Sequence, residues 1–123
     1  DDGRVIDPDQ VLGPARPGFK LAYCSDTRPC DSADELAADA DVLIHEATYP
    51  AGEEQLAHER GHSTAADAAR CASRAGAQQL FLTHISQRYT DLDAHSNEVR
   101  EIFENTRTAR DLLSVELERR DER

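Results

Sequence analysis

The sequence predicts an α/β fold, in which strands and helices alternate along the chain. Four short runs have the length and apolar character of strands. The stretches between them are rich in alanine, and their apolar residues recur at helical spacing. Strands that alternate with helices build a layered α/β domain with right-handed crossovers.

The strands are predicted from two kinds of pattern. Residues 19–25 (FKLAYCS) alternate between apolar and polar positions. Residues 41–45 (DVLIH) contain a compact run of Leu and β-branched residues, which is typical of a strand buried on both faces. The predicted strands span 19–25, 41–45, 79–84 and 112–118.

Capping signals indicate where two of the helices begin. Ser32-x-x-Glu35 and Thr64-x-x-Asp67 both have the form of a capping box, and Gly76 is a suitable C-cap for the second helix. The predicted helices span 32–40, 64–75 and 96–105, with a loop over 46–62 that contains one helical turn at 53–59.

The domain is predicted to occupy residues 19–118. Proline and glycine concentrate in residues 1–18, an irregular lead-in with at most a short strand around Val5-Ile6. Residues 119–123 (RRDER) should form a solvated, frayed tail. A chain of 123 residues suits one small domain or half of a larger one, and its lack of methionine suggests a cut or processed piece.

The charge of the chain is strongly negative. It carries 25 acidic and 14 basic residues, a net charge of −11, and Lys20 is its only lysine. Such a surface is typical of salt-adapted proteins, where dense carboxylates keep the chain solvated. A disordered acidic chain is disfavoured because the apolar residues fall in well-bounded runs. The charge alone argues against a nucleic-acid partner, but high salt screens this repulsion.

The sequence predicts neither a membrane partner nor a disulfide framework. It contains no apolar run of transmembrane length and no N-terminal signal pattern, so we expect a cytoplasmic protein. The three cysteines are odd in number and are expected to be small apolar residues: Cys24, Cys30 and Cys71.

Ionisable side chains follow each of the first three predicted strands. The first strand leads into Asp26, the second into His45-Glu46 and the third into His84. Open α/β sheets bind ligands at the carboxyl ends of their strands. His62 precedes the second helix, where free N–H groups favour an anion such as phosphate. The set combines metal ligands with acid–base groups.

Each of these residues also has a simpler explanation when taken alone. An aspartate after a strand is usually a turn former, and a histidine there is usually a hydrogen-bonded surface residue. His58 and His95 are predicted to be ordinary polar loop residues. The chain has no H-x-H-x-D-H, H-E-x-x-H, Walker or G-x-S-x-G motif, so it lacks most ligands of a two-metal centre.

Four motifs occur in order along the chain: YCSDTRPC at 23–30, HEATY at 45–49, GHST at 61–64 and LTHISQRY at 82–89. Together they resemble the ribonuclease Z family, the tRNA 3′-processing endonucleases of the metallo-β-lactamase superfamily. The segment VLGPARPG at 11–18 is also similar to the family's approach to this region. The resemblance covers about residues 3–118. It implies the C-terminal half of a metallo-β-lactamase-type αβ/βα sandwich, and the lysine-poor composition resembles a haloarchaeal member.

The resemblance also implies a role for each matched residue. Asp26 matches an aspartate that bridges two zinc ions, and His84 matches the last zinc-ligating histidine. His62 matches a histidine that acts beside the scissile phosphate, and Glu46 belongs to the loop that acts with it. The supporting positions, of which Arg88 is expected to contact phosphate or anchor its loop, are His45, Thr48, Thr64 and Arg88.

The implied reaction is metal-assisted hydrolysis of a phosphodiester bond in precursor tRNA, with two zinc ions, or manganese, in the complete site. His62 would assist the departing 3′-oxygen. The full-length parent is expected to be a homodimer, and these 123 residues alone are expected to be inactive. Two alternatives remain: another phosphodiesterase or hydrolase of the superfamily, and a non-catalytic half-domain that binds a partner chain carrying the missing ligands.

Overall fold

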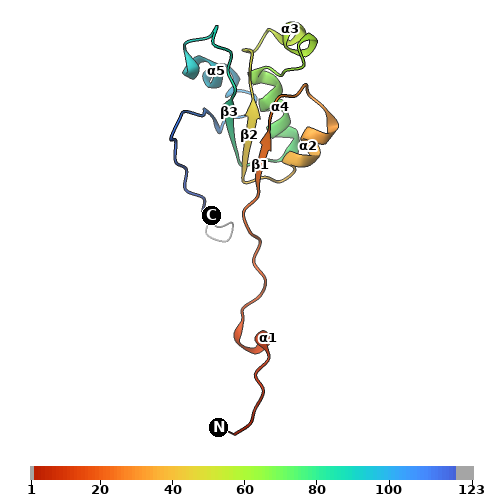
Figure 1. Ribbon diagram of the computed structural model, residues 1–123, viewed down its shortest axis with the longest axis vertical. Coiled ribbons are helices and arrows are strands. Elements are labelled where there is room, and N and C mark those ends of the chain that lie inside the picture. The colour runs from red at the N-terminus through yellow and green to blue at the C-terminus, as the bar shows by residue number, and fades with distance from the viewer. Residues whose placement is uncertain (1, 119–123) are drawn as a thin grey trace.

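A four-stranded parallel sheet forms the centre of the computed structural model, which describes residues 2–118 (Figure 1). Its strands lie in the order β1-β2-β3-β4, and each is parallel to its neighbours. Their bounds are β1 (Leu21–Cys24), β2 (Val42–Glu46), β3 (Gln79–Thr83) and β4 (Thr106–Thr108). The predicted α/β class is therefore confirmed.

The helices connect the strands, and α2 and α4 cover one face of the sheet (Figure 1). The helices are α1 (Pro8–Val11), α2 (Asp31–Ala37), α3 (Glu54–Glu59), α4 (Ala65–Ala75) and α5 (Leu92–Val99). The core between helices and sheet is built largely from alanine, with Leu43, Leu80 and Leu82 as its largest buried apolar side chains. Small side chains let α4 lie close to the strands, so the core between helix and sheet is thin.

The other face of the sheet is only partly covered. In β1, Ala22 and Cys24 are buried under the helices, whereas Leu21 and Tyr23 on the opposite face are 63% and 58% exposed. The segment 109–117 runs along this face and leaves a largely apolar groove of about 310 Å³ against β1, β2 and β3. An apolar sheet face left open in this way is unusual for an independent domain.

The first three predicted strands are confirmed to within two residues, but the fourth is wrong. The last strand is Thr106–Thr108, which pairs with Leu80–Leu82, and not 112–118. Its inward threonines bond to carbonyl oxygens, Thr106 to Phe103 and Thr108 to Leu92, so the strand needs no apolar side chains. Leu113, Val115 and Leu117 instead line the groove on the open sheet face, and Leu112 is exposed.

Two of the helix predictions need correction. The helix placed at 96–105 lies at 92–99, because the Asp91 side chain caps its start by accepting from the Ala94 N–H. The Ser32 capping box is also wrong: α2 begins one residue earlier, with Cys30 as its N-cap. The acidic Asp31 then occupies the first turn, where it complements the helix dipole.

The structure also tests the remaining predictions about caps, turns and the two ends of the chain. The capping box of Thr64 and Asp67, the left-handed Gly76 C-cap and the helical turn near 53–59 are confirmed. Residues 2–18 of the lead-in, predicted to be irregular with at most a short strand around Val5-Ile6, contain no strand but include α1, and the lead-in extends away from the folded body (Figure 1). The predicted tail, 119–123, lies outside the described residues.

The structure also tests three smaller expectations. None of the three cysteines is in a disulfide; Cys24 and Cys71 are buried, whereas Cys30 is exposed. His95 is buried against Tyr89, with ring centroids 5.4 Å apart, so its placement in a polar loop was wrong. No helix in the described part of the chain is long and apolar enough to cross a membrane.

Candidate metal centre

The predicted site residues come from segments that meet at one edge of the sheet. Cys24 lies opposite His45 and His45 opposite Leu82, so β1, β2 and β3 end at nearly the same level. Asp26 follows β1, Glu46 ends β2 and His84 follows β3. A bridge between Tyr49 and Thr64 brings the loop before α4, and with it His62, to the same edge.

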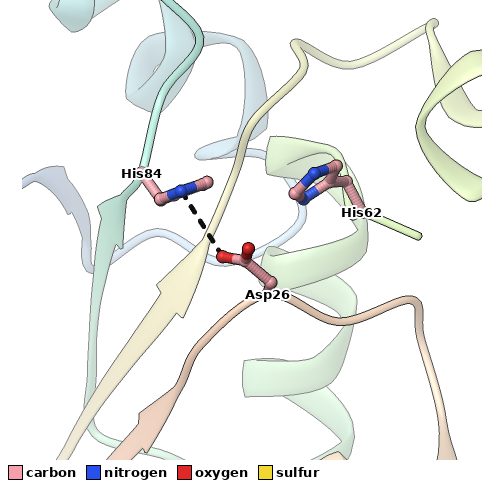
Figure 2. Close-up of side chains that lie close together, drawn as sticks. All are labelled: Asp26, His62 and His84. Carbon is pink, nitrogen blue, oxygen red and sulfur yellow. Dashed lines mark ion pairs between the residues drawn. The ribbon is translucent and has the colours of Figure 1, made fainter. Parts of the chain in front are cut away.

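Asp26, His62 and His84 form a group that could hold a metal ion. Each offers one ligand atom, and these atoms all lie within 4.8 Å of one another. The His62 and His84 rings stack with centroids 5.7 Å apart, and Figure 2 shows the Asp26 carboxylate below them. Carboxylate oxygen and imidazole nitrogen are ligands that zinc binds.

Each of the two histidines uses its Nδ1 atom for a hydrogen-bond contact within the protein. His62 Nδ1 lies 2.8 Å from Glu46 Oε1, and His84 Nδ1 lies 3.1 Å from Thr48 Oγ1. The Thr48 hydroxyl donates to Glu46 Oε2 at 2.7 Å, so it can accept from His84. With Nδ1–H donated in each case, neutral rings carry a lone pair on Nε2, the form in which imidazole binds metals.

The contact between His84 and Asp26 is consistent with a cation at this place. His84 Nε2 lies 3.4 Å from Asp26 Oδ1, and both side chains are about half exposed. If Nδ1 of His84 carries its proton toward Thr48, two acceptor atoms face each other across this distance. A metal ion or an additional proton would satisfy both, so the residues present fit a metal site.

Glu46 supports this group from beneath. It is fully buried and accepts four hydrogen bonds, from the Thr27 N–H, from His62 Nδ1 and from both the N–H and the hydroxyl of Thr48. Burial raises the pKa of the Glu46 carboxyl, but the bonds from Thr48, His62 and Thr27 outweigh it and hold the pKa below its usual value. Glu46 is thus an anion whose geometry orients His62.

His84 adopts a backbone conformation that is uncommon for a residue with a side chain. Its φ is +57°, in the left-handed region. This turn ends β3 abruptly and directs the ring toward Asp26 (Figure 2). Such conformations cost of order 1–3 kcal/mol and persist where the surrounding contacts enforce them.

The loops of the site are tied to one another by further hydrogen bonds. The Ser63 hydroxyl donates to the Thr27 carbonyl oxygen at 2.5 Å, and Arg28 Nε donates to the His58 carbonyl oxygen. The Ser86 N–H donates to the Thr48 carbonyl oxygen at 3.1 Å. Sequence reasoning overlooked Thr27 and Ser63, since the motif pattern carries no signal of their mutual contact.

The other predicted residues lie around this centre. His45 is buried in the sheet and its Nδ1 bonds to the Glu46 carbonyl oxygen at 2.7 Å; burial lowers its pKa, so it is neutral. Thr64 is buried as the N-cap of α4, where it accepts from the Asp67 N–H. Arg88 is exposed, and its backbone N–H donates to the Ser86 hydroxyl.

Comparisons with known proteins match the same region. The family model "Beta-lactamase superfamily domain" matches residues 11–85. The ribonuclease Z of Geobacillus kaustophilus is 50% identical over 97% of this chain and 39% of its own length. That of Methanothermobacter thermautotrophicus is 47% identical over 96% of this chain and 38% of its own. This chain therefore spans about two fifths of the length of these curated relatives.

A solved structure shows the same fold. The human short-form tRNase Z superposes with a TM-score of 0.61 at 34% identity, over 78% of this chain and 32% of its own length. A parallel sheet with a carboxylate–histidine group at its carboxyl edge defines an α/β domain that carries a candidate metal site. The chain belongs to the β-lactamase superfamily domain family.

Proposed function

We propose that the protein carrying this chain is a metal-dependent endoribonuclease that removes 3′ trailers from precursor tRNA. The observation that carries the proposal is the group of Asp26, His62 and His84 at the sheet edge, in a chain whose relatives are named ribonuclease Z. The substrate is inferred from the names of the relatives, and the metal-dependent chemistry is inferred from the geometry of this group.

Asp26 and His84 would hold the metal, with zinc as the proposed ion and a second zinc held jointly with residues beyond this chain. Such a metal activates water and neutralises charge that develops on a phosphodiester. His62 is fixed by Glu46 through Nδ1. When its ring also carries a proton on Nε2, it would donate that proton to the departing 3′-oxygen and return to the neutral form. Thr48 holds the His84 ring, and Thr64 holds the start of α4.

We further propose that residues 19–118 are the C-terminal half of an αβ/βα sandwich. The support is the open apolar face at Leu21 and Tyr23, which a second sheet would cover, together with the greater length of the relatives. The complete protein would act as a cytoplasmic homodimer on precursor tRNA. Its acidic, lysine-poor surface fits a salt-adapted, haloarchaeal source.

The test uses the protein that carries this chain and a precursor tRNA with a 3′ trailer. We expect trailer release that EDTA abolishes and zinc or manganese restores. Replacing Asp26 or His84 by Ala should lower the rate by at least about 100-fold, since loss of a ligand costs more than loss of an outer-shell partner. Asp93→Ala, at an exposed aspartate that pairs with Arg110 outside the group, is the matched control. Normal trailer release by the Asp26→Ala, His84→Ala double variant would refute the assignment.

A further inference from the structure

Three exposed arginines near the metal centre have no acidic partner. Within residues 2–118, no carboxylate lies at ion-pair distance from Arg28, Arg60 or Arg88. Four arginines elsewhere each pair with a carboxylate, namely Arg4, Arg70, Arg74 and Arg110, whereas Arg100 and Arg107 contact uncharged groups far from the metal centre. In a chain of net charge −11, the three arginines beside the metal centre therefore keep their positive charge where a phosphodiester would lie.

Arg28 and Arg60 are brought to the same corner of the molecule. Arg28 Nε donates to the carbonyl oxygen of His58, in the last turn of α3. Arg60 is the C-cap of the same helix. The Arg28 guanidinium therefore lies at the end of α3 from which the Arg60 side chain extends, although the two residues are far apart in the sequence.

The two arginines belong to the same two chain segments as Asp26 and His62 of the metal centre. Arg28 lies two residues after Asp26, and Arg60 lies two residues before His62. The Ser63–Thr27 hydrogen bond holds these two segments together. Arg28 is anchored through its Nε, while its terminal nitrogens make no hydrogen bond to any of the described residues.

We propose that Arg28 and Arg60 form a phosphate-binding pair that holds a backbone phosphate of the RNA next to the phosphate that is cleaved. The proposal rests on the proposed function for its substrate class, a phosphodiester chain. Guanidinium groups bind phosphate through paired, charge-assisted hydrogen bonds. Because these bonds are made to phosphate, the pair would recognise the chain without regard to its base sequence.

The pair also offers an account of how an acidic protein holds RNA. Its overall negative charge repels a polyanion at long range. Arginines that are not neutralised by carboxylates can reverse that charge locally, where the substrate must lie. Arg70 and Arg74, which are neutralised, cannot serve in this way.

The test compares the Arg28→Gln, Arg60→Gln variant with wild type in the complete protein. Cleavage of precursor tRNA should show KM raised about tenfold or more and kcat nearly unchanged, since the charge-assisted bonds to substrate disappear from ground and transition states alike. Binding of a single-stranded RNA oligonucleotide, measured in EDTA, should show a salt slope reduced by about 0.7 for each phosphate that the variant no longer neutralises.

The matched control is Arg74→Gln, Arg100→Gln, which removes the same charge from helix ends that precede β3 and β4, at the opposite sheet edge. It should leave KM and the salt slope at wild-type values. Unchanged KM and salt slope in the Arg28, Arg60 variant would overturn the inference. A wild-type protein that fails to cleave precursor tRNA would refute the proposed function instead, while the binding measurement would still decide the role of the arginines.

Discussion

At the scale of single residues, Glu46 is the side chain on which the site geometry depends most. It is an acceptor for four hydrogen bonds that reach three separate segments, through Thr27, Thr48 and His62. A buried anion of this kind stabilises the fold only while all its donors are present. The H-E-A-T motif that contains Glu46 could be identified in the sequence, but the burial of the Glu46 side chain could not be predicted from it.

Replacing Glu46 by Gln should both destabilise the protein and misplace His62. The amide nitrogen would face donors that now bond to a carboxylate oxygen, so we expect a loss of about 2–3 kcal/mol in the free energy of unfolding. In the complete protein kcat should fall far more than KM changes, because His62 loses its orienting partner.

Urea unfolding and steady-state kinetics would check both expectations for Glu46→Gln. Glu59→Gln is the matched control, because Glu59 is exposed and, among residues 2–118, its side chain accepts a hydrogen bond from the surface residue Gln55 alone. An unfolding free energy equal to that of wild type would contradict the role assigned to Glu46.

The sequence indicated the components of the site but not their connections. Asp26, His62 and His84 were identified from motif spacing and strand ends. The Thr48 contacts and the left-handed backbone of His84 depend on three-dimensional proximity, and local sequence carries no trace of them. His58 was taken as a loop residue, yet it bonds to Asp67 at 2.7 Å.

At the scale of elements, the start of α4 is held by a network around Asp67. This buried carboxylate accepts from the Thr64 N–H at 3.0 Å, from His58 at 2.7 Å and from Arg70 at 3.2 Å. Burial raises the pKa of Asp67, but these partners outweigh it and lower the pKa below its usual value of 3.8. The network fixes the helix that follows His62.

This lowered pKa predicts how Asp67 contributes to stability. The stabilisation should be fully present above pH 3.8, the ordinary value for the unfolded chain, and should be lost as the pH falls through the lower folded value. Asp67→Asn should therefore cost about 1–3 kcal/mol at pH 6, and the difference from wild type should shrink toward pH 3.

Urea unfolding of both proteins at several pH values would measure that difference. Asp93→Asn is a suitable control, because Asp93 is exposed and its side-chain partner is the surface residue Arg110. A difference between wild type and Asp67→Asn that stays constant down to pH 3 would contradict the prediction.

Elements with strong local signals were predicted well, and those without were not. The strand at 79–83 and the helix ending at Gly76 carry apolar runs and caps that act locally. The strand Thr106–Thr108 forms because its backbone pairs with β3. Its inward residues are threonines that bond to carbonyl oxygens, so its sequence is polar and resembles that of a loop.

At the scale of the whole molecule, one face of the sheet is covered by helices and the other face is largely open. The covered face packs on α2 and α4, whereas the open face presents Leu21 and Tyr23 beside the groove along 109–117. The outer edge of β1, the first strand in the sheet order, adds backbone hydrogen-bonding groups to this surface.

The isolated 123-residue chain should therefore self-associate through the open face. Leu21→Glu combined with Tyr23→Glu should make it largely monomeric, because charge on this face opposes apolar contact. Leu36→Glu, an exposed leucine on α2, should not have this effect. Sedimentation velocity of the three proteins measures their state of association. A monomeric wild-type chain would contradict the prediction that the open sheet face drives self-association.

The exposure of Cys30 makes the metal centre accessible to chemical labelling. Hydrogen bonds from the Ser32 side chain, the Ala33 N–H and Thr27 lower the pKa of its thiol, which favours the reactive thiolate, whereas burial raises the pKa of both other thiols, that of Cys71 to about 12. A maleimide dye should therefore attach at Cys30 alone. Because Cys30 follows Asp26 so closely in the chain, one fluorophore, introduced without mutation, would report on RNA and metal arriving at the site.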